Sequence, residues 1–142
     1  MRIWSKDLIP VLPNKQLKAM RYELGDMIKQ YPNIKNPLVK FANNYSCNYL
    51  LNYFCLICME CAERQINMNQ KYNIEIQDMA IEKSWEKNPS IAVYNVARFN
   101  EDNDRYLKQC LYNLQEKYDR GIITEEEWER VLEGVINNER KL

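Results

Sequence analysis

The chain contains no histidine. This absence excludes serine–histidine and cysteine–histidine nucleophile pairs, histidine metal sites and general acid–base catalysis by histidine. Glycine is scarce as well, and the three glycines lie too far apart to form a phosphate-binding loop. No apolar run approaches the roughly 20 residues that a membrane-spanning helix needs. The chemistry that remains belongs to carboxylates, lysines, tyrosines and the amino terminus.

Charge is balanced overall but unevenly distributed. Residues 1–40 carry eight Lys and Arg against three Asp and Glu, whereas residues 101–142 carry seven against eleven. Zero net charge argues against a nucleic-acid binder, but the basic N-terminal part of the chain keeps that class open.

Because a secretory signal and a membrane-spanning segment are both missing, we expect a cytoplasmic location and no membrane partner.

The composition favours a helical globule. With 142 residues, five prolines and three glycines, the chain is long enough to fold around a core without a metal or a disulfide. We predict an all-α fold: a single compact domain of three main helices with the N-terminal segment packed between them, followed by a C-terminal helical hairpin. The corresponding division is a helical domain over residues 1–103 and a hairpin appendage over residues 104–142.

Apolar spacing places the helices. The first is predicted over residues 14–30, with an apolar stripe at Leu17, Met20, Leu24, Met27, Ile28 and Tyr31 and a solvated basic face at Lys15, Lys18, Arg21 and Lys29. A buried central helix is predicted within residues 45–73, and a third helix near Pro89. The first helix of the hairpin is predicted to end at Gly121, and the second is predicted to begin with a capping box. Three tyrosines in apolar stretches are expected in the core: Tyr49, Tyr53 and Tyr112.

Five cysteines are present, and Cys55, Cys58 and Cys61 have a spacing that can indicate an iron–sulfur site. On a helix, however, steps of three residues rotate by about 300°, so these thiols do not converge on one point. Buried free cysteines are common in protein cores. We therefore predict reduced thiols that pack in the core, and no metal.

The amino terminus is the best amine nucleophile that a chain without histidine offers. An α-amine has a reference pKa of roughly 7.7 to 8.0, against roughly 10.4 for lysine, so much more of it is unprotonated near neutral pH. Methionine aminopeptidases need a small second residue, and Arg2 is large. We expect the amine to belong to Met1.

Three segments resemble the landmarks of a known family: "MRIWSKDLIPVLPNKQLKAMRYELG", "YLLNYFCLICMECAERQINMN" and "SIAVYNVARFNED". They are similar, over residues 1–103, to the pyrimidine-dimer DNA glycosylase and abasic-site lyase family of the phage endonuclease V type. The resemblance implies an N-terminal amine nucleophile at Met1, an assisting carboxylate at Glu23, no cofactor, and lesion-containing double-stranded DNA as partner. It also implies DNA contacts at Arg2, Lys6, Lys18, Arg21 and Tyr22.

Other features leave alternatives open. Glu23 falls at the border between the apolar stripe and the basic face of its helix, where a solvated carboxylate is the ordinary interpretation. Tyr22 stands where the family has an arginine, Asp26 reverses a positive charge, and an acidic hairpin replaces a basic, aromatic tail. The alternatives are an enzyme of the same scaffold acting on another damaged base, and an inactive binding module whose acidic hairpin contacts a protein partner.

Overall fold

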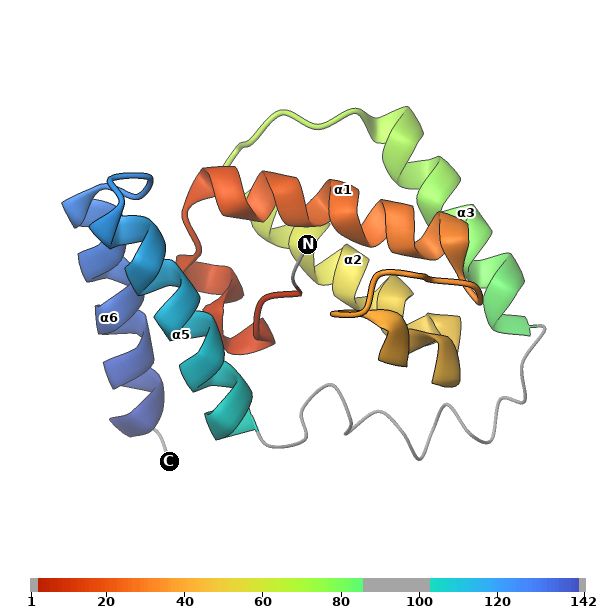
Figure 1. Cartoon of the computed structure of the whole chain (residues 1–142). Helices are drawn as coiled ribbons and strands as arrows, with labels where there is room; N and C mark the ends of the chain where they lie inside the picture. Colours follow the sequence, from red (N-terminus) through yellow and green to blue (C-terminus); the bar gives the residue numbers. More distant parts are fainter. Residues whose placement is uncertain (1–2, 86–102, 141–142) are drawn as a thin grey trace. The chain divides into compact units, whose positions relative to one another are not determined.

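The computed structural model describes residues 3–85 and 103–140. Within these ranges the residues form helices and connecting loops and no strand, so the predicted all-α class is confirmed (Figure 1). None of the helices in this part of the chain combines the length and apolarity that crossing a membrane requires. The third helix predicted near Pro89 lies outside the described residues.

The contacts divide the described chain into two compact units. The first unit takes in residue 3 and residues 18–85, and the second takes in Trp4–Leu17 together with residues 103–140. An early segment of the chain therefore packs with the C-terminal helices. The domain boundary between residues 103 and 104 stays a prediction. In the structure, residues 4–17 belong to the same compact unit as the hairpin.

Helix α1 (Asn14–Gln30) has the predicted bounds, and its predicted apolar stripe is buried throughout. Helix α2 (Cys47–Glu63) begins after Ser46, whose hydroxyl accepts a hydrogen bond from the Asn48 amide at 3.2 Å. Most of its apolar residues are buried, and Phe54 and Ile57 are fully enclosed, but Leu56 and Met59 are exposed, so the helix is not buried all round. These two helices confirm that the apolar spacing locates the core of the first unit.

The cysteines behave as packing residues. All five are free, Cys58 and Cys61 are buried, and Cys55 is half-buried. In residues 3–85 and 103–140 no cluster of three or more cysteine or acidic side chains is arranged to hold a metal ion. The predicted core packing is confirmed for Cys58 and Cys61, whereas the reduced state of the thiols stays a prediction.

One helix boundary was not predicted. The central segment breaks after Glu63, and a separate helix α3 (Gln70–Trp85) follows. Gln65 adopts a left-handed φ of 60°, and the amides of Gln65 and Ile66 bond to the carbonyls of Ala62 and Cys61 at 3.0 and 2.8 Å. This is the Schellman arrangement that ends helices, in which glycine usually takes the left-handed position. Because glutamine takes it here, the sequence gives no stop signal.

The second unit contains a short 3₁₀ helix η1 (Lys6–Val11) and the hairpin of α5 (Asn103–Asp119) and α6 (Glu125–Arg140). The turn uses Gly121 at a φ of 77°, and the predicted capping box is present in both directions, between Thr124 and Glu127 at 3.0 and 3.2 Å. The predicted hairpin is thus confirmed.

The early segment is held to this hairpin at two points. The Ser5 amide donates a hydrogen bond to the Cys110 sulfur on α5 at 3.3 Å. Helix η1 packs on α6, where Val11 occupies the space left by the missing side chain of Gly134.

The predicted burial of three tyrosines is confirmed for two of them. Tyr49 and Tyr53 are buried in the first unit, but Tyr112 on α5 is 74% exposed, so placing it in the core was wrong.

Candidate nucleic-acid interface on α1 and α3

The predicted site residues divide between described and undescribed parts of the chain. Glu23 lies in the middle of α1 and is half-buried, in agreement with its predicted border position. Met1 and Arg2 lie outside the described residues. Lys6 is exposed on η1 in the second unit, whereas Lys18, Arg21, Tyr22 and Glu23 belong to the first unit on one helix. The structure therefore brings together the four residues on α1.

Arg21 differs from the prediction. It was expected on the solvated face of α1, but only 3% of it is exposed, whereas the other three basic residues of that face are exposed. Its Nε donates a hydrogen bond to Oδ1 of Asn73 at 2.8 Å, and its Nη2 donates one to the backbone carbonyl of Asn69 at 3.2 Å. Both acceptors belong to α3 or the loop before it, which cover this side of α1. The prediction was wrong because that helix was not foreseen.

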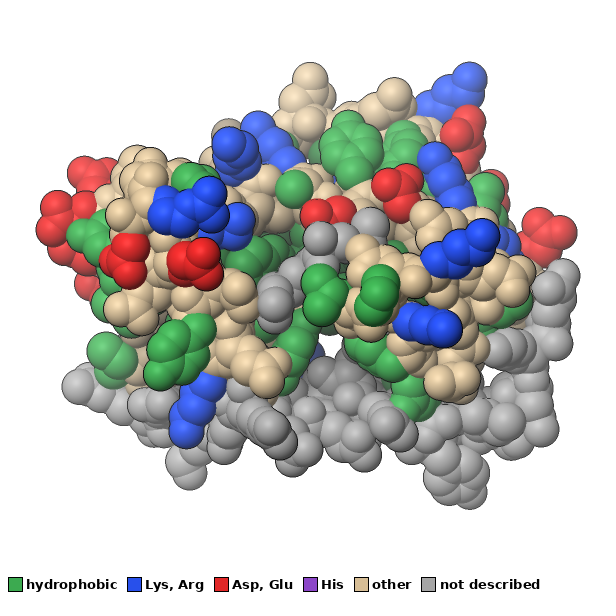
Figure 2. Space-filling view, in the orientation of Figure 1, with side chains coloured by type: hydrophobic (Ala, Val, Ile, Leu, Met, Phe, Trp, Pro, Cys, Tyr) green, Lys and Arg blue, Asp and Glu red, His purple; other side chains and the backbone are tan. Residues whose placement is uncertain are grey.

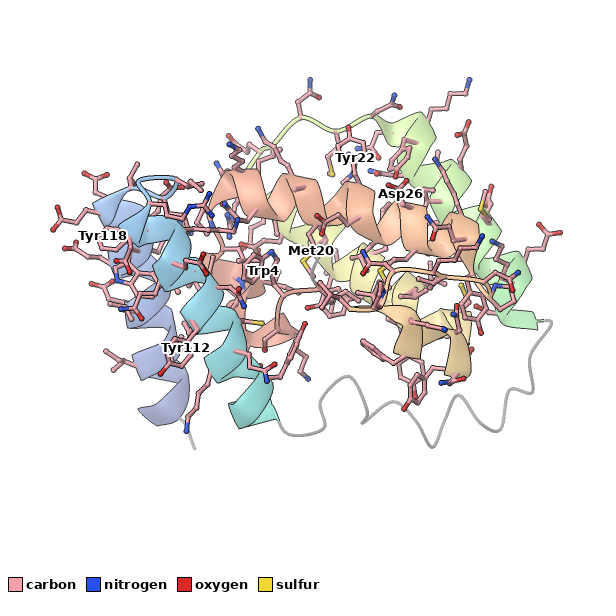
Figure 3. The ribbon with its side chains drawn as sticks, in the orientation of Figure 1. Trp4, Met20, Tyr22, Asp26, Tyr112 and Tyr118 are labelled. Carbon is pink, nitrogen blue, oxygen red and sulfur yellow. The ribbon has the colours of Figure 1, made fainter. Side chains whose placement is uncertain are left out.

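Two tyrosines lie against the buried guanidinium. The Arg21 Cζ atom is 5.0 Å from the ring centroid of Tyr22 and 4.9 Å from that of Tyr72, which comes from α3. The two ring centroids are 5.3 Å apart, and the ring planes are inclined by 45°. These distances are typical of cation–π and tilted aromatic contacts. Tyr22 nevertheless remains 53% exposed and lies near α3 beside Asp26 (Figure 3).

The positive charge of Arg21 has no carboxylate partner within ion-pair distance among the described residues. The nearby Cys58 thiol does not neutralise it either. Burial raises the pKa of Cys58 to about 11, although the guanidinium of Arg21 acts in the opposite direction. At neutral pH the thiol is uncharged, so it forms no ion pair with the guanidinium of Arg21.

The position of Tyr72 depends on a glycine. The Tyr72 hydroxyl lies so close to Gly25 that a side chain there would collide with it. The Tyr72 ring also lies near a second cation, because the Lys29 ammonium is 5.4 Å from its centroid. Burial raises the pKa of the Tyr72 hydroxyl, and the Asp26 carboxylate adds to the increase. Two cations of α1, Arg21 and Lys29, thus lie close to the Tyr72 ring.

On the face shown in Figure 2, the lysine and arginine side chains are interspersed with acidic and hydrophobic ones. Lys18 lies four residues before Tyr22 on α1 and is exposed, so the two side chains share one helix face. Binding to phosphates on this side would depend on a few separate contacts.

Three residues of this site were not predicted: Asn69, Tyr72 and Asn73. No motif singles them out, because their importance follows from the packing of α3 on this part of the molecule. The helix end at Gln65 is the feature that would have predicted them. It separates α2 from a further helix, α3, whose residues can then pack against α1.

The fold and this site define a small all-α protein with a surface tyrosine supported by a buried cation. The family model described as pyrimidine dimer DNA glycosylase matches residues 1–74. This match covers more than half of the chain, and the chain belongs to that family, whose members are DNA repair glycosylases. The resemblance inferred from the sequence is confirmed over these residues, which include every predicted site residue. No curated protein and no solved structure gives a significant match.

Proposed function

We propose that this protein is a DNA repair glycosylase with an associated abasic-site lyase activity. Its substrate is double-stranded DNA that contains a damaged base or a pyrimidine dimer. Family membership over residues 1–74 carries the proposal, because this segment contains both proposed catalytic residues, Met1 and Glu23. No cofactor is required by this chemistry.

The reaction uses the α-amine of Met1 as nucleophile. The amine attacks C1′ of the damaged nucleotide, the glycosidic bond breaks, and the base leaves with a proton. The resulting Schiff base makes the C2′ proton acidic, and loss of that proton breaks the bond from C3′ to its phosphate oxygen. Hydrolysis then releases the sugar and restores the amine. Glu23 exchanges protons with the amine and the Schiff base, a role that suits a half-buried carboxylate on α1.

The proposed DNA contacts have different roles. Lys6 and Lys18 are exposed and are free to approach phosphates. Arg2 is proposed as a further contact beside the nucleophile. Arg21 is buried, so we assign it the support of Tyr22 in place of a direct phosphate contact. Extruding the target nucleotide costs a few kcal/mol, and the cost is lowest at damaged pairs.

We also retain the predicted cytoplasmic location as part of the proposal. Its support is chemical: all five cysteines are free thiols, as expected for a reducing compartment.

Borohydride trapping on a duplex with one abasic site tests the lyase. We expect a covalent complex, with mass spectrometry locating the modified amine on Met1. Glu23→Gln should reduce the trapping rate by about 100-fold, in the range of general acid–base effects. Glu129→Gln, at an exposed position of α6, is the matched control and should not change it. A wild-type protein that forms no complex, or a complex attached to a lysine, would contradict the proposal.

Two further measurements separate the alternatives. A panel of duplexes carrying a pyrimidine dimer or another damaged base identifies the lesion through base release. DNA affinity measured against salt distinguishes an enzyme from an inactive module with a protein partner. A duplex-binding enzyme that neutralises several phosphates should give a steep log–log slope. A flat slope together with no trapping would favour the module.

A further inference from the structure

We propose that Tyr22, supported by Arg21 and Tyr72, forms a stacking platform for one unpaired nucleobase. These three residues are called the tyrosine platform below. The inference rests on the proposed function only in taking DNA as the ligand, and it requires no catalytic step. It assigns a binding role to Tyr22 and positioning roles to two residues that lie beneath it.

The first argument is that the Tyr22 ring is held in place from below. The guanidinium of Arg21 lies 5.0 Å from its centroid and is itself fixed by two hydrogen bonds to the α3 side. The Tyr72 ring supports Tyr22 at a centroid distance of 5.3 Å. A ring held in advance loses little conformational entropy when a ligand stacks on it.

The second argument is that these contacts leave part of the ring open. Tyr22 is 53% exposed although Arg21 and Tyr72 both lie against it. A single exposed aromatic residue is ordinary on a protein surface. Here, however, the ring has a fixed support, because the Arg21 guanidinium against it is held by two hydrogen bonds and also contacts Tyr72. This support distinguishes Tyr22 from a tyrosine that is merely exposed.

The third argument concerns the ligand. A flat aromatic face with a cation behind it suits a planar nucleobase, and stacking of this kind tolerates any base because every base has a π-face. Lys18, one turn before Tyr22, is exposed and supplies a positive charge for a neighbouring phosphate. Bases inside an intact duplex are already stacked on one another. The platform therefore takes a base that has been extruded or has lost its partner.

Fluorescence of 2-aminopurine tests the platform without any chemistry. The probes are duplexes with a non-reactive tetrahydrofuran abasic analogue, and the 2-aminopurine stands opposite the analogue in one duplex and beside it in another. When wild-type protein is bound, the 2-aminopurine of one of these two duplexes should stack on Tyr22, and its emission should stay quenched. Tyr22→Ala should weaken binding roughly tenfold and raise that emission. Tyr22→Phe should behave like the wild type, because it keeps the ring.

The positioning role of Tyr72 is tested separately from its contribution to folding. Tyr72→Leu should raise the emission as Tyr22→Ala does, with unchanged helical circular dichroism, whereas Tyr72→Phe should not. The matched control is Tyr112→Ala, which removes an exposed tyrosine from α5 and should leave both binding and emission unchanged.

The outcomes are distinct for the two proposals. If wild-type protein binds but Tyr22→Ala changes neither affinity nor emission, the platform is wrong and the lyase proposal is unaffected. If the platform variants behave as expected but no covalent complex is trapped on a reactive abasic site, the lyase proposal fails and the platform stands. A wild-type protein without DNA affinity overturns both.

Discussion

The two compact units treat similar residues in different ways. In the second unit Arg120 is exposed and lies 3.9 Å from Glu116 one turn earlier, and Tyr118 stacks on Trp128 at a centroid distance of 5.8 Å. In the first unit Arg21 is buried without a carboxylate partner among the described residues, and it supports an exposed tyrosine. The second unit follows the ordinary rules for a stable helical hairpin.

This difference supports the interface that we propose on α1. Sequences usually agree with their folds at every level, and departures concentrate at functional sites. The departure in the first unit falls within the segment that matches the glycosylase family, whereas α5 and α6 lie outside that match. The following predictions test the contrast between the two units, from the largest expected effect to the smallest.

The first prediction compares the two arginines. Arg21→Ala removes a buried side chain and leaves Oδ1 of Asn73 without its donor, so the free energy of unfolding should fall by about 3 kcal/mol. Arg120→Ala breaks an exposed pair and should change it by less than about 0.5 kcal/mol. Urea unfolding measures both. Equal losses would remove the contrast between the units.

The second prediction concerns Gly25. Gly25→Ala adds a methyl group that collides with the Tyr72 hydroxyl, and displacing that ring should lower the free energy of unfolding by about 1 to 2 kcal/mol. In an exposed helix the same change would stabilise by up to about 1 kcal/mol. Adding Tyr72→Phe removes the colliding oxygen and should recover part of the loss. Stabilisation by the single change would show that Tyr72 does not cover this glycine.

The third prediction uses the two helix caps. Thr124→Ala in the second unit and Ser46→Ala in the first each remove one capping hydrogen bond and should cost about 1 kcal/mol. If the units open separately, hydrogen exchange should accelerate in α5 and α6 for the first variant and in α2 for the second. Identical exchange patterns would mean that the units open together.

The smallest expected effect is a dependence of stability on pH. The pKa of Cys58 is about 11 in the folded protein against 9.0 as its reference, so the folded state retains the proton more strongly. This contribution is complete below pH 9 and is lost as pH rises towards 11. By pH 9.5 the loss should be somewhat less than about 1 kcal/mol. Cys58→Ala should have a shallower decline in unfolding free energy over this range, and a parallel decline would contradict the assignment.

Much of the fold could be predicted from local patterns. The bounds of α1, the turn at Gly121 and the capping box at Thr124 depend on residues within a few positions of one another, so sequence spacing reports them directly. The burial of Cys58 and Cys61 was also predicted from their place in an apolar segment, although Leu56 and Met59 of the same segment are exposed.

The site could be predicted only in part. The roles proposed for Glu23 and Tyr22 come from the family resemblance and stay predictions, whereas the place of Glu23 at the edge of the core was predicted correctly. The burial of Arg21 was missed because its partner Asn73 lies 52 positions later in the chain. That pairing depends on the helix end at Gln65, which uses a residue that normally avoids a left-handed backbone. Distant packing and an unmarked helix end are thus the two reasons for the error.

The packing of the early segment against the hairpin has a consequence for biosynthesis. Residues Trp4–Leu17 are translated well before α5 and α6, with which they share the sulfur contact of Cys110 and the packing around Gly134. These contacts of the arm can therefore form only after both hairpin helices have been translated.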